Sequence, residues 1–318
     1  MKFPDVLGFL LVGFVLGDAG LRLIHIPLAS QASGIVIALA ASVILYDCGH
    51  DLDRAHLATA WRGLALLVSV GVIITAGLTA CATHFAFGWD WRTSALFGAI
   101  VAATDPAAVI PVMRQSGVSE RISNVAQAES ALNDVVGALL TIVTLAAVQG
   151  GLLNGAAGIS MIAVTALYLA AFVAGLSHRG EVQPIFRVLT FVARLIVFVI
   201  LGAAMSPLGA ASPIVPTVVF LAAFMFVIRP IAVFASLWAD RAHHWTLREL
   251  LMLSWVRETG VISAALAANV AALAIPGAES IVAKTTAVIV ATVVVQGLST
   301  GRLARSLGVT SAQPASET

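Results

Sequence analysis

The sequence contains few charged residues. Only 10% of its 318 residues are Asp, Glu, Lys or Arg, whereas soluble globular domains contain about 25%. The 17 basic residues nearly balance the 16 acidic ones and the net charge is +1, so the chain offers no basic face to a nucleic acid. This composition excludes an ordinary soluble enzyme, and we expect no nucleic-acid partner.

Cysteine is also scarce. The two cysteines, Cys48 and Cys81, both lie in or beside apolar stretches, and they cannot form a disulfide framework or a four-ligand zinc site. The segment from Asp47 to His56 contains several His and Asp residues. It lacks a recognised metal-ligand spacing, so we interpret it as a solvated connector, and we expect neither a metal site nor a cofactor.

Apolar residues, by contrast, make up 60% of the chain. Ten apolar stretches are long enough to cross a bilayer, which requires about 17 to 25 helical residues. They predict an all-α, polytopic membrane protein with about ten transmembrane helices. The first stretch could instead be a signal peptide, but Phe14–Asp18 offers no small-x-small cleavage site. The ten stretches are 4–20, 30–48, 63–87, 93–113, 123–149, 156–176, 185–205, 213–238, 247–273 and 281–299.

The basic residues indicate how these spans are oriented, because Lys and Arg accumulate in cytoplasmic loops. If the N-terminus is cytoplasmic, only Arg22, Arg92 and Lys284 fall on the opposite side. We therefore predict that both termini are cytoplasmic. The basic residues then on the cytoplasmic side are Lys2, Arg54, Arg62, Arg114, Arg121, Arg179, Arg187, Arg241, Arg248, Arg302 and Arg305.

Acidic residues inside the spans are the first candidates for function, because an ionisable group costs about 2.5 to 3.5 kcal/mol at mid-membrane. Asp105 lies in a Thr104-Asp105-Pro106 sequence within the fourth span. Proline disfavours helix at the residue before it, so we predict that the helix breaks at Thr104-Asp105. The alternative is a helix that starts at the membrane surface, with these residues as its cap. Broken helices near the midplane are where secondary transporters bind ions.

The fifth span carries the sequence Glu129-Ser130-Ala131-Leu132-Asn133-Asp134. At 3.6 residues per turn, its four polar side chains fall within an arc of about 140°, so they share one helix face. Carboxylate, amide and hydroxyl oxygens are the ligands that hard cations prefer. The face therefore predicts a cation site in which a proton competes for the carboxylate, and the alternative is a polar seam between helices.

The eighth and ninth spans add three charged residues. Arg257 and Glu258 lie near the middle of the ninth span, where Arg257 could neutralise one of the carboxylates or lie beside Glu258 at a water-filled vestibule. Arg229 lies late in the eighth span, where it could serve function or extend to the membrane surface as an anchor. Arg194, within the seventh span, has no evident partner in the sequence.

These motifs resemble the signature of bacterial monovalent cation:proton antiporters of the sodium/proton exchanger kind. The resemblance rests on Gly98–Val109 followed by Glu129–Asp134, with further matches at Leu45–Gly49, Phe198–Gly202, Arg229–Val233 and Val295–Leu298. It covers nearly the whole chain. It is greatest to the branch of potassium/proton antiporters and cell-volume regulators, whose fold is an inverted repeat with broken helices. The resemblance thus implies a secondary transporter of Na⁺ or K⁺ and protons, and not an enzyme.

The resemblance also implies roles for particular residues. Asp134 would bind the cation and the proton in turn, and exchange would be electroneutral, as is associated with the Asn-Asp form of the motif. The implied co-ligands are Asn133, Ser130 and the backbone at Thr104. The other candidate residues are Asp105 at the break, Glu129 in an ion bridge, Asp47 as a nearby acid, and Arg257, Glu258 and Arg229 in support.

The chain departs from the family pattern in two respects. Thr259 occupies the place of the usual arginine, and Arg257 lies two residues earlier. Family members also have about thirteen spans, so the chain lacks about three, which belong to the dimer-forming half. We assign 63–149 and 213–299 to the two core half-repeats and 1–62 and 150–212 to a shortened scaffold. The resemblance implies the plasma membrane as location and a homodimer as assembly, although the shortening puts the dimer in question.

Two other functions are possible on the sequence. A non-transporting, truncated remnant of the family would retain these motifs without activity. An intramembrane aspartyl protease could use Asp47 after Tyr46, but it needs a Gly-x-Gly-Asp sequence on a second helix, and none occurs.

Overall fold

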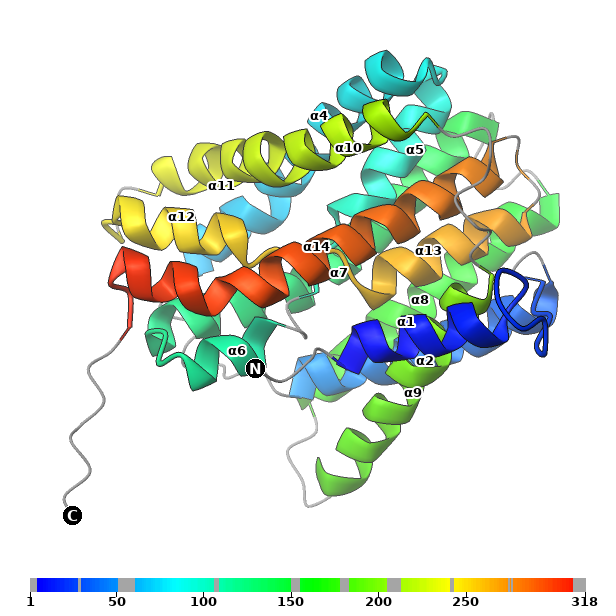
Figure 1. Cartoon of the computed structure of the whole chain (residues 1–318), viewed down its shortest axis with the longest axis horizontal. Coiled ribbons are helices and arrows are strands. Elements are labelled where there is room, and N and C mark those ends of the chain that lie inside the picture. The colour runs from blue at the N-terminus through cyan, green and yellow to red at the C-terminus, as the bar shows by residue number, and fades with distance from the viewer. Residues whose placement is uncertain are drawn as a thin grey trace.

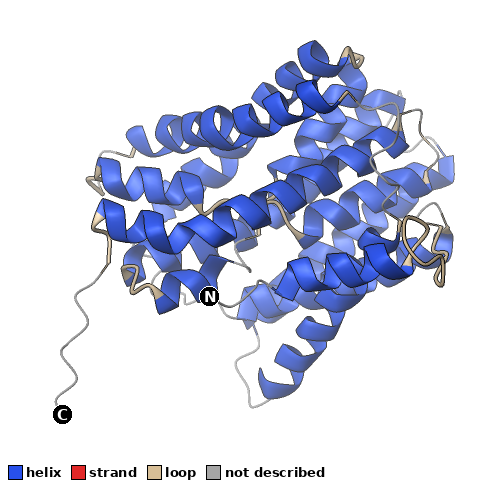
Figure 2. Cartoon of the chain, in the orientation of Figure 1, coloured by secondary structure: helices blue, strands red, loops and turns tan. Residues whose placement is uncertain are grey.

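The computed structural model describes residues 5–27, 30–50, 61–105, 109–149, 155–177, 183–204, 213–240, 243–273, 275 and 277–310. Within these ranges the fold is helical, and the only strand-like pairing is an isolated bridge between Val118 and Thr310. Figure 2 shows helices joined by short loops. The prediction of an all-α fold is therefore confirmed, whereas most of the Asp47–His56 connector lies outside the described residues.

The helices follow one another along the whole chain. Two of the elements, η1 and η2, are π-helical turns inside longer helices. The bounds are α1 Asp5–Leu16, α2 Gln31–His50, η1 Leu67–Gly71, α4 Val72–Phe87, α5 Trp91–Ala102, α6 Val109–Gln115, α7 Glu120–Gln149, α8 Gly155–Ser177, α9 Gln183–Ala203, α10 Ile214–Ala223, η2 Phe224–Ile228, α11 Arg229–Trp238, α12 Leu247–Trp255, α13 Val261–Ala272 and α14 Ala278–Leu307.

The helices are those of a multi-pass membrane protein. Six are long and apolar enough to cross a membrane, and three shorter apolar helices accompany them within the described residues. The number of ten spans remains a prediction, because a broken span is divided between two short helices. The six long spans are Ala32–His50, Trp61–Phe87, Glu120–Val148, Ile185–Ala203, Ile214–Trp238 and Ala278–Leu307.

The predicted break in the fourth span is present. Helix α5 ends at Ala102, Ala103 is extended with ψ 139°, and α6 begins at Val109. Residues 103–105 are therefore not helical, as the proline predicts. Thr104 is buried and follows the 12 helical residues of α5, so these residues interrupt a helix and do not stand at its start.

The ninth stretch, which we expected to be one continuous span, is also broken. Helix α12 ends at Trp255, and α13 begins only at Val261. The segment contains no proline, so the local signal of the first break is missing. Gly260 has φ −136° and ψ −145°, and a Cβ there would lie 2.1 Å from the Cβ of Asp105. The second break is therefore set by its contact with the first break.

The same order of elements occurs twice along the chain. A long helix interrupted by a π-turn is followed by a half-helix, a break, a second half-helix and another long helix. The first series runs from 61 to 149 and the second from 214 to 307. Matching broken helices in the two halves of a chain are the mark of inverted-repeat transporters.

The helices form two groups. Figure 1 shows α1, α2, α8 and α9 gathered on one side, α4, α10, α11 and α12 on the other, and α7, α13 and α14 between them. In the first group α1 packs on α9 and α2 packs on α8 and α9. Glycines permit these close approaches, since a Cβ at Gly202 would lie 2.3 Å from the carbonyl oxygen of Leu10. Small residues at helix contacts are typical of membrane proteins.

Candidate functional site

The two breaks cross and satisfy each other's backbone. The Asp105 N–H donates to the Glu258 carbonyl oxygen at 2.9 Å, and the Val261 N–H donates to Asp105 Oδ2 at 3.4 Å. In the other direction, Ser263 Oγ donates to the carbonyl oxygens of Ile100 and Ala103 at 2.8 and 3.3 Å. A carboxylate thus caps the start of α13, where the helix dipole favours negative charge, and a hydroxyl caps the end of α5.

The polar face of α7 packs against the first break. Ser130 Oγ donates to the Thr104 carbonyl oxygen at 2.5 Å. Asn133 Nδ2 donates to the Ala102 carbonyl oxygen at 3.0 Å, to Thr104 Oγ1 at 2.9 Å and to Glu129 Oε1 at 3.1 Å. The structure therefore brings together the residues that the sequence placed on one helix face, and it places them at the break.

Two oxygens from consecutive residues of α7 have no hydrogen-bond partner among the described residues. They are Asn133 Oδ1 and Asp134 Oδ1, and both are buried. The orientation of the Asn133 amide follows from its three acceptors, which require the nitrogen on their side. Buried oxygens without partners are unfavourable, and they are the ligands that a hard cation requires. The pair is therefore chemically suited to a cation or, at the carboxylate, to a proton.

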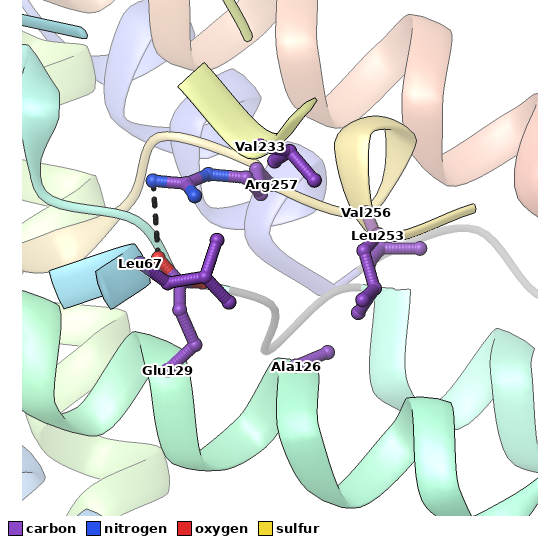
Figure 3. Close-up of a pocket in the computed structure, with 7 residues that line it drawn as sticks. All are labelled: Leu67, Ala126, Glu129, Val233, Leu253, Val256 and Arg257. Carbon is purple, nitrogen blue, oxygen red and sulfur yellow. Dashed lines mark ion pairs between the residues drawn. The ribbon is translucent and has the colours of Figure 1, made fainter. Parts of the chain in front are cut away.

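Glu129 is held by an ion pair. Arg257 Nη2 lies 3.0 Å from Glu129 Oε1, and the two side chains are 3% and 5% exposed. Figure 3 shows Arg257 reaching from the second break to Glu129 on α7. Arg257 thus forms an ion pair with one of the carboxylates, and its burial contradicts the alternative of a vestibule surface. The pair lies in a pocket that is otherwise apolar, lined by Leu67, Ala126, Val233, Leu253 and Val256.

Arg229 does not extend to the membrane surface, so its interpretation as an anchor is wrong. Its side chain is fully buried, and Nη2 donates to Thr259 Oγ1 at 2.8 Å. Its guanidinium carbon also lies 4.7 Å from the centre of the Phe224 ring. The side chain is retained inside because Phe224 and Thr259 supply a cation–π contact and a hydrogen-bond acceptor there. Arg229 therefore lies against Thr259, the residue at which the family usually has an arginine.

The remaining predicted residues lie around this centre. Glu258 is buried, contrary to a place at a water-filled vestibule, and its carbonyl oxygen holds the first break. Asp105 is half-buried at the start of α13. Asp47 is half-buried on α2, a helix of the first group that contacts α7 and α13.

Sequence reasoning missed two residues that shape the site. Ser263 caps the end of α5, and Thr292 on α14 accepts the Thr259 N–H at 3.3 Å. Isolated hydroxyls in an Ala- and Val-rich stretch were the available signal. Within the described ranges, no three His, Cys, Asp or Glu side chains are grouped so as to hold a metal ion.

Comparison with known proteins identifies similar sequences and folds. The family profile described as "Sodium/hydrogen exchanger, transmembrane" matches residues 1–178 and 166–306. The K(+)/H(+) antiporter NhaP of Alkalimonas amylolytica is 25% identical over 96% of this chain and 62% of its own length. The Na(+)/H(+) antiporter NhaS2 of Synechocystis sp. is 27% identical over 49% of this chain and 28% of its own length.

Solved structures show the same fold. The sodium proton antiporter MjNhaP1 of Methanocaldococcus jannaschii superposes with a TM-score of 0.76 and 19% identity, over 96% of this chain and 92% of that one. The chain therefore has the inverted-repeat antiporter fold. It spans 62% of the length of the full-length NhaP relative.

Proposed function

The chain belongs to the sodium/hydrogen exchanger family, and from this premise we propose that it exchanges a monovalent cation, Na⁺ or K⁺, for protons across a membrane. It would thus be a secondary transporter and not an enzyme. The relatives are named K(+)/H(+) and Na(+)/H(+) antiporters, so both cations are candidates. The same oxygen ligands serve both ions, which differ in size.

The observation that carries the proposal is that two consecutive residues of α7, Asn133 and Asp134, each have a buried oxygen without a hydrogen-bond partner among the described residues, and that Asn133 also contacts the first break. Glu129 is already neutralised by Arg257, which leaves Asp134 as the buried carboxylate of α7 that can exchange partners. Ser130 and the Thr104 backbone lie alongside as co-ligands.

In this mechanism Asp134 binds the cation and the proton in turn. A single carboxylate that holds either one cation or one proton exchanges one positive charge for another, so transport is electroneutral. Asp105 contributes negative charge from the break while one of its oxygens caps α13. Alternating access would come from movement of the core, 63–149 and 213–299, against the scaffold, 1–62 and 150–212.

We place the protein in the plasma membrane with both termini in the cytoplasm. The concentration of Lys and Arg in the loops of one side supports this orientation. A homodimer is the assembly proposed, because exposed apolar side chains on α1 and α9, such as Leu11, Val188 and Phe191, leave the scaffold group open to another membrane-embedded surface.

Exchange can be tested in proteoliposomes with a pH-sensitive dye inside. Adding Na⁺ or K⁺ outside at alkaline pH is expected to move protons in the opposite direction. Asp134→Asn is expected to abolish the signal, because the amide cannot take up a proton in exchange for a cation. Asp18→Asn is the matched control, since Asp18 is an exposed carboxylate paired with His25, and it is expected to transport like the parent.

Two results would reject this proposal. Transport by Asp134→Asn at the parental rate would show that this carboxylate is not the shared site. A parent protein that moves no cation would favour the non-transporting remnant. Activity is also expected to fall at acid pH, because a protonated Asp134 cannot bind the cation, and a flat profile from about pH 5 to pH 9 would contradict competition at one carboxylate.

A further inference from the structure

Helix α13 joins the crossing to the scaffold. It begins at the second break, and it packs on α2 and α9 of the first group as well as on α5, α7 and α14. Its residues Val261 and Ala264 belong to a buried apolar cluster with Ile44 of α2 and Phe198 of α9. A movement of the core against the scaffold therefore has to change the contacts of α13.

The contact with the scaffold continues to the far end of α13. A Cβ on Gly34, the fourth residue of α2, would lie 3.6 Å from Asn269 Oδ1, and Asn269 is the ninth of the twelve residues of α13. Since Val261 clusters with Ile44 and Asn269 meets Gly34, the two helices run antiparallel along each other for about 12 to 15 Å. In the orientation proposed above, the Asn269 end lies on the side opposite the cytoplasm, which we call the outer side.

The half-helices that lead from the crossing to the cytoplasmic side are placed differently. Helices α6 and α12 both pack on α7 and α14, which are core helices. The core is thus docked on the scaffold in its outer half, through α13. Alternating access opens a midplane site to one side at a time, so access from the outer side requires this docking to open.

The amide of Asn269 makes the docked state less favourable. The side chain is 8% exposed, and Nδ2 is buried without a hydrogen-bond partner among the described residues. A buried donor without a partner is unfavourable, and water that enters an open boundary would pair with it. The closed state therefore carries a cost that the open state does not.

We propose that Asn269 and Gly34 form an outer latch, in which the unpaired amide of Asn269 keeps the closure weak enough to be reversed. Glycine at position 34 lets the two helices approach, and a large side chain there would push Asn269 away. An apolar side chain at position 269 would instead strengthen the closure. The inference rests on the proposed function, because the latch controls the access of the cation to the crossing from the outer side.

The first test measures opening on the outer side without transport. The variant Ala264→Cys, at a position that is 1% exposed, is made in a Cys48→Ser, Cys81→Ser background. A membrane-impermeant thiol reagent is added to intact cells, and its rate of reaction reports how often α13 leaves the scaffold. Asn269→Leu is expected to slow this labelling about tenfold, because the closed state no longer carries an unpaired amide.

Two further variants bracket this result. Gly34→Leu is expected to speed the labelling, because its side chain has too little room beside Asn269. Asn124→Leu makes the same chemical change at a partly exposed position near the start of α7, and it is expected to be labelled like the parent. Labelling of Asn269→Leu at the parental rate or faster would overturn the inference, as would Gly34→Leu labelled no faster than the parent.

A disulfide across the latch tests the same contact in transport. In the same background, oxidation of Gly34→Cys, Asn269→Cys is expected to stop cation exchange in proteoliposomes, and a reductant is expected to restore it. The matched control is Gly63→Cys, Leu237→Cys, which joins two core helices, since a Cβ on Gly63 would lie 3.2 Å from Leu237 Cδ2. Exchange is expected to survive oxidation of this control.

Exchange that continues with the disulfide between positions 34 and 269 closed would overturn the inference. A parent that moves no cation, while the labelling rates differ as expected, would reject the proposed function and leave the latch intact.

Discussion

Two carboxylates of helix α7 lie little more than one turn apart and differ in what holds them. Glu129 receives Arg257 at 3.0 Å and the Asn133 amide at 3.1 Å. Asp134 has a buried oxygen without a hydrogen-bond partner among the described residues. A buried carboxylate with fixed partners fastens helices together, whereas one without them can exchange a cation for a proton. The first is therefore expected to control stability and the second to control transport.

Fixed partners also hold the crossing of the two breaks. The backbone of each break is satisfied by the other, through Asp105, Glu258 and Ser263. Non-helical backbone within a membrane is tolerated only where it is buried in protein or lines a cavity. The crossing supplies such a setting and holds the polar face of α7 in place.

The largest effect on stability is expected when the ion pair between Arg257 and Glu129 is broken. Arg257→Met leaves the Glu129 carboxylate buried without its cation, which costs about 3 to 5 kcal/mol when one partner of a buried pair is removed. A large drop in melting temperature in detergent is therefore expected. The double variant Arg257→Met, Glu129→Gln should recover much of the loss, because no charge is left unpaired. A single variant that melts like the parent would show that the pair does not fasten the helices.

A smaller loss is expected at the crossing itself. In Gly260→Ala the new Cβ would lie 2.1 Å from the Cβ of Asp105, so one of the breaks has to shift. Overpacking of this kind costs about 1 to 3 kcal/mol. Gly77→Ala in α4 is the control, since nothing lies within 4 Å of a Cβ at that position. Equal melting temperatures for the two variants would mean that the breaks do not touch as closely as described.

The comparison also separates what the sequence predicts from what it does not. Pro106 marks the first break and helical periodicity collects the polar residues of α7, because both signals are local. The second break has no local signal, since Gly260 is placed by contact with Asp105, which is far away in the chain. Arg229 lies close enough to a span end to extend outward, and its inward position depends on Thr259 and Phe224.

The same chemical change on the two carboxylates sharpens the comparison. Glu129→Gln leaves Arg257 buried without its anion and is expected to lower the melting temperature. Asp134→Asn replaces a carboxylate by an amide of the same shape, and its melting temperature is expected to be no lower than that of the parent, because the amide carries no buried charge. Both variants are measured in detergent without Na⁺ or K⁺. If Asp134→Asn is as unstable as Glu129→Gln, Asp134 has a fixed partner and the comparison fails.

The smallest effect is expected at Asp90, a carboxylate that has fixed partners but lies outside the membrane spans. It caps α5, with Oδ1 accepting from Thr93 Oγ1 at 2.6 Å and Oδ2 from the Thr93 and Arg92 N–H groups at 3.1 and 3.0 Å. The hydrogen bonds from Thr93, first the side chain and then the backbone, lower the pKa of Asp90 below its ordinary value of 3.8.

Because this pKa is lower in the folded state, the Asp90 carboxylate contributes stability above its ordinary pKa, and that stability is lost as the pH falls through the folded pKa. Asp90→Asn is therefore expected to melt slightly below the parent at pH 7, and the difference should begin to shrink as the pH falls below about 4. A difference that persists unchanged to about pH 3 would show that the carboxylate charge is not what stabilises the cap. In that case fixed partners would make a carboxylate stabilise the fold at Glu129 but not at Asp90.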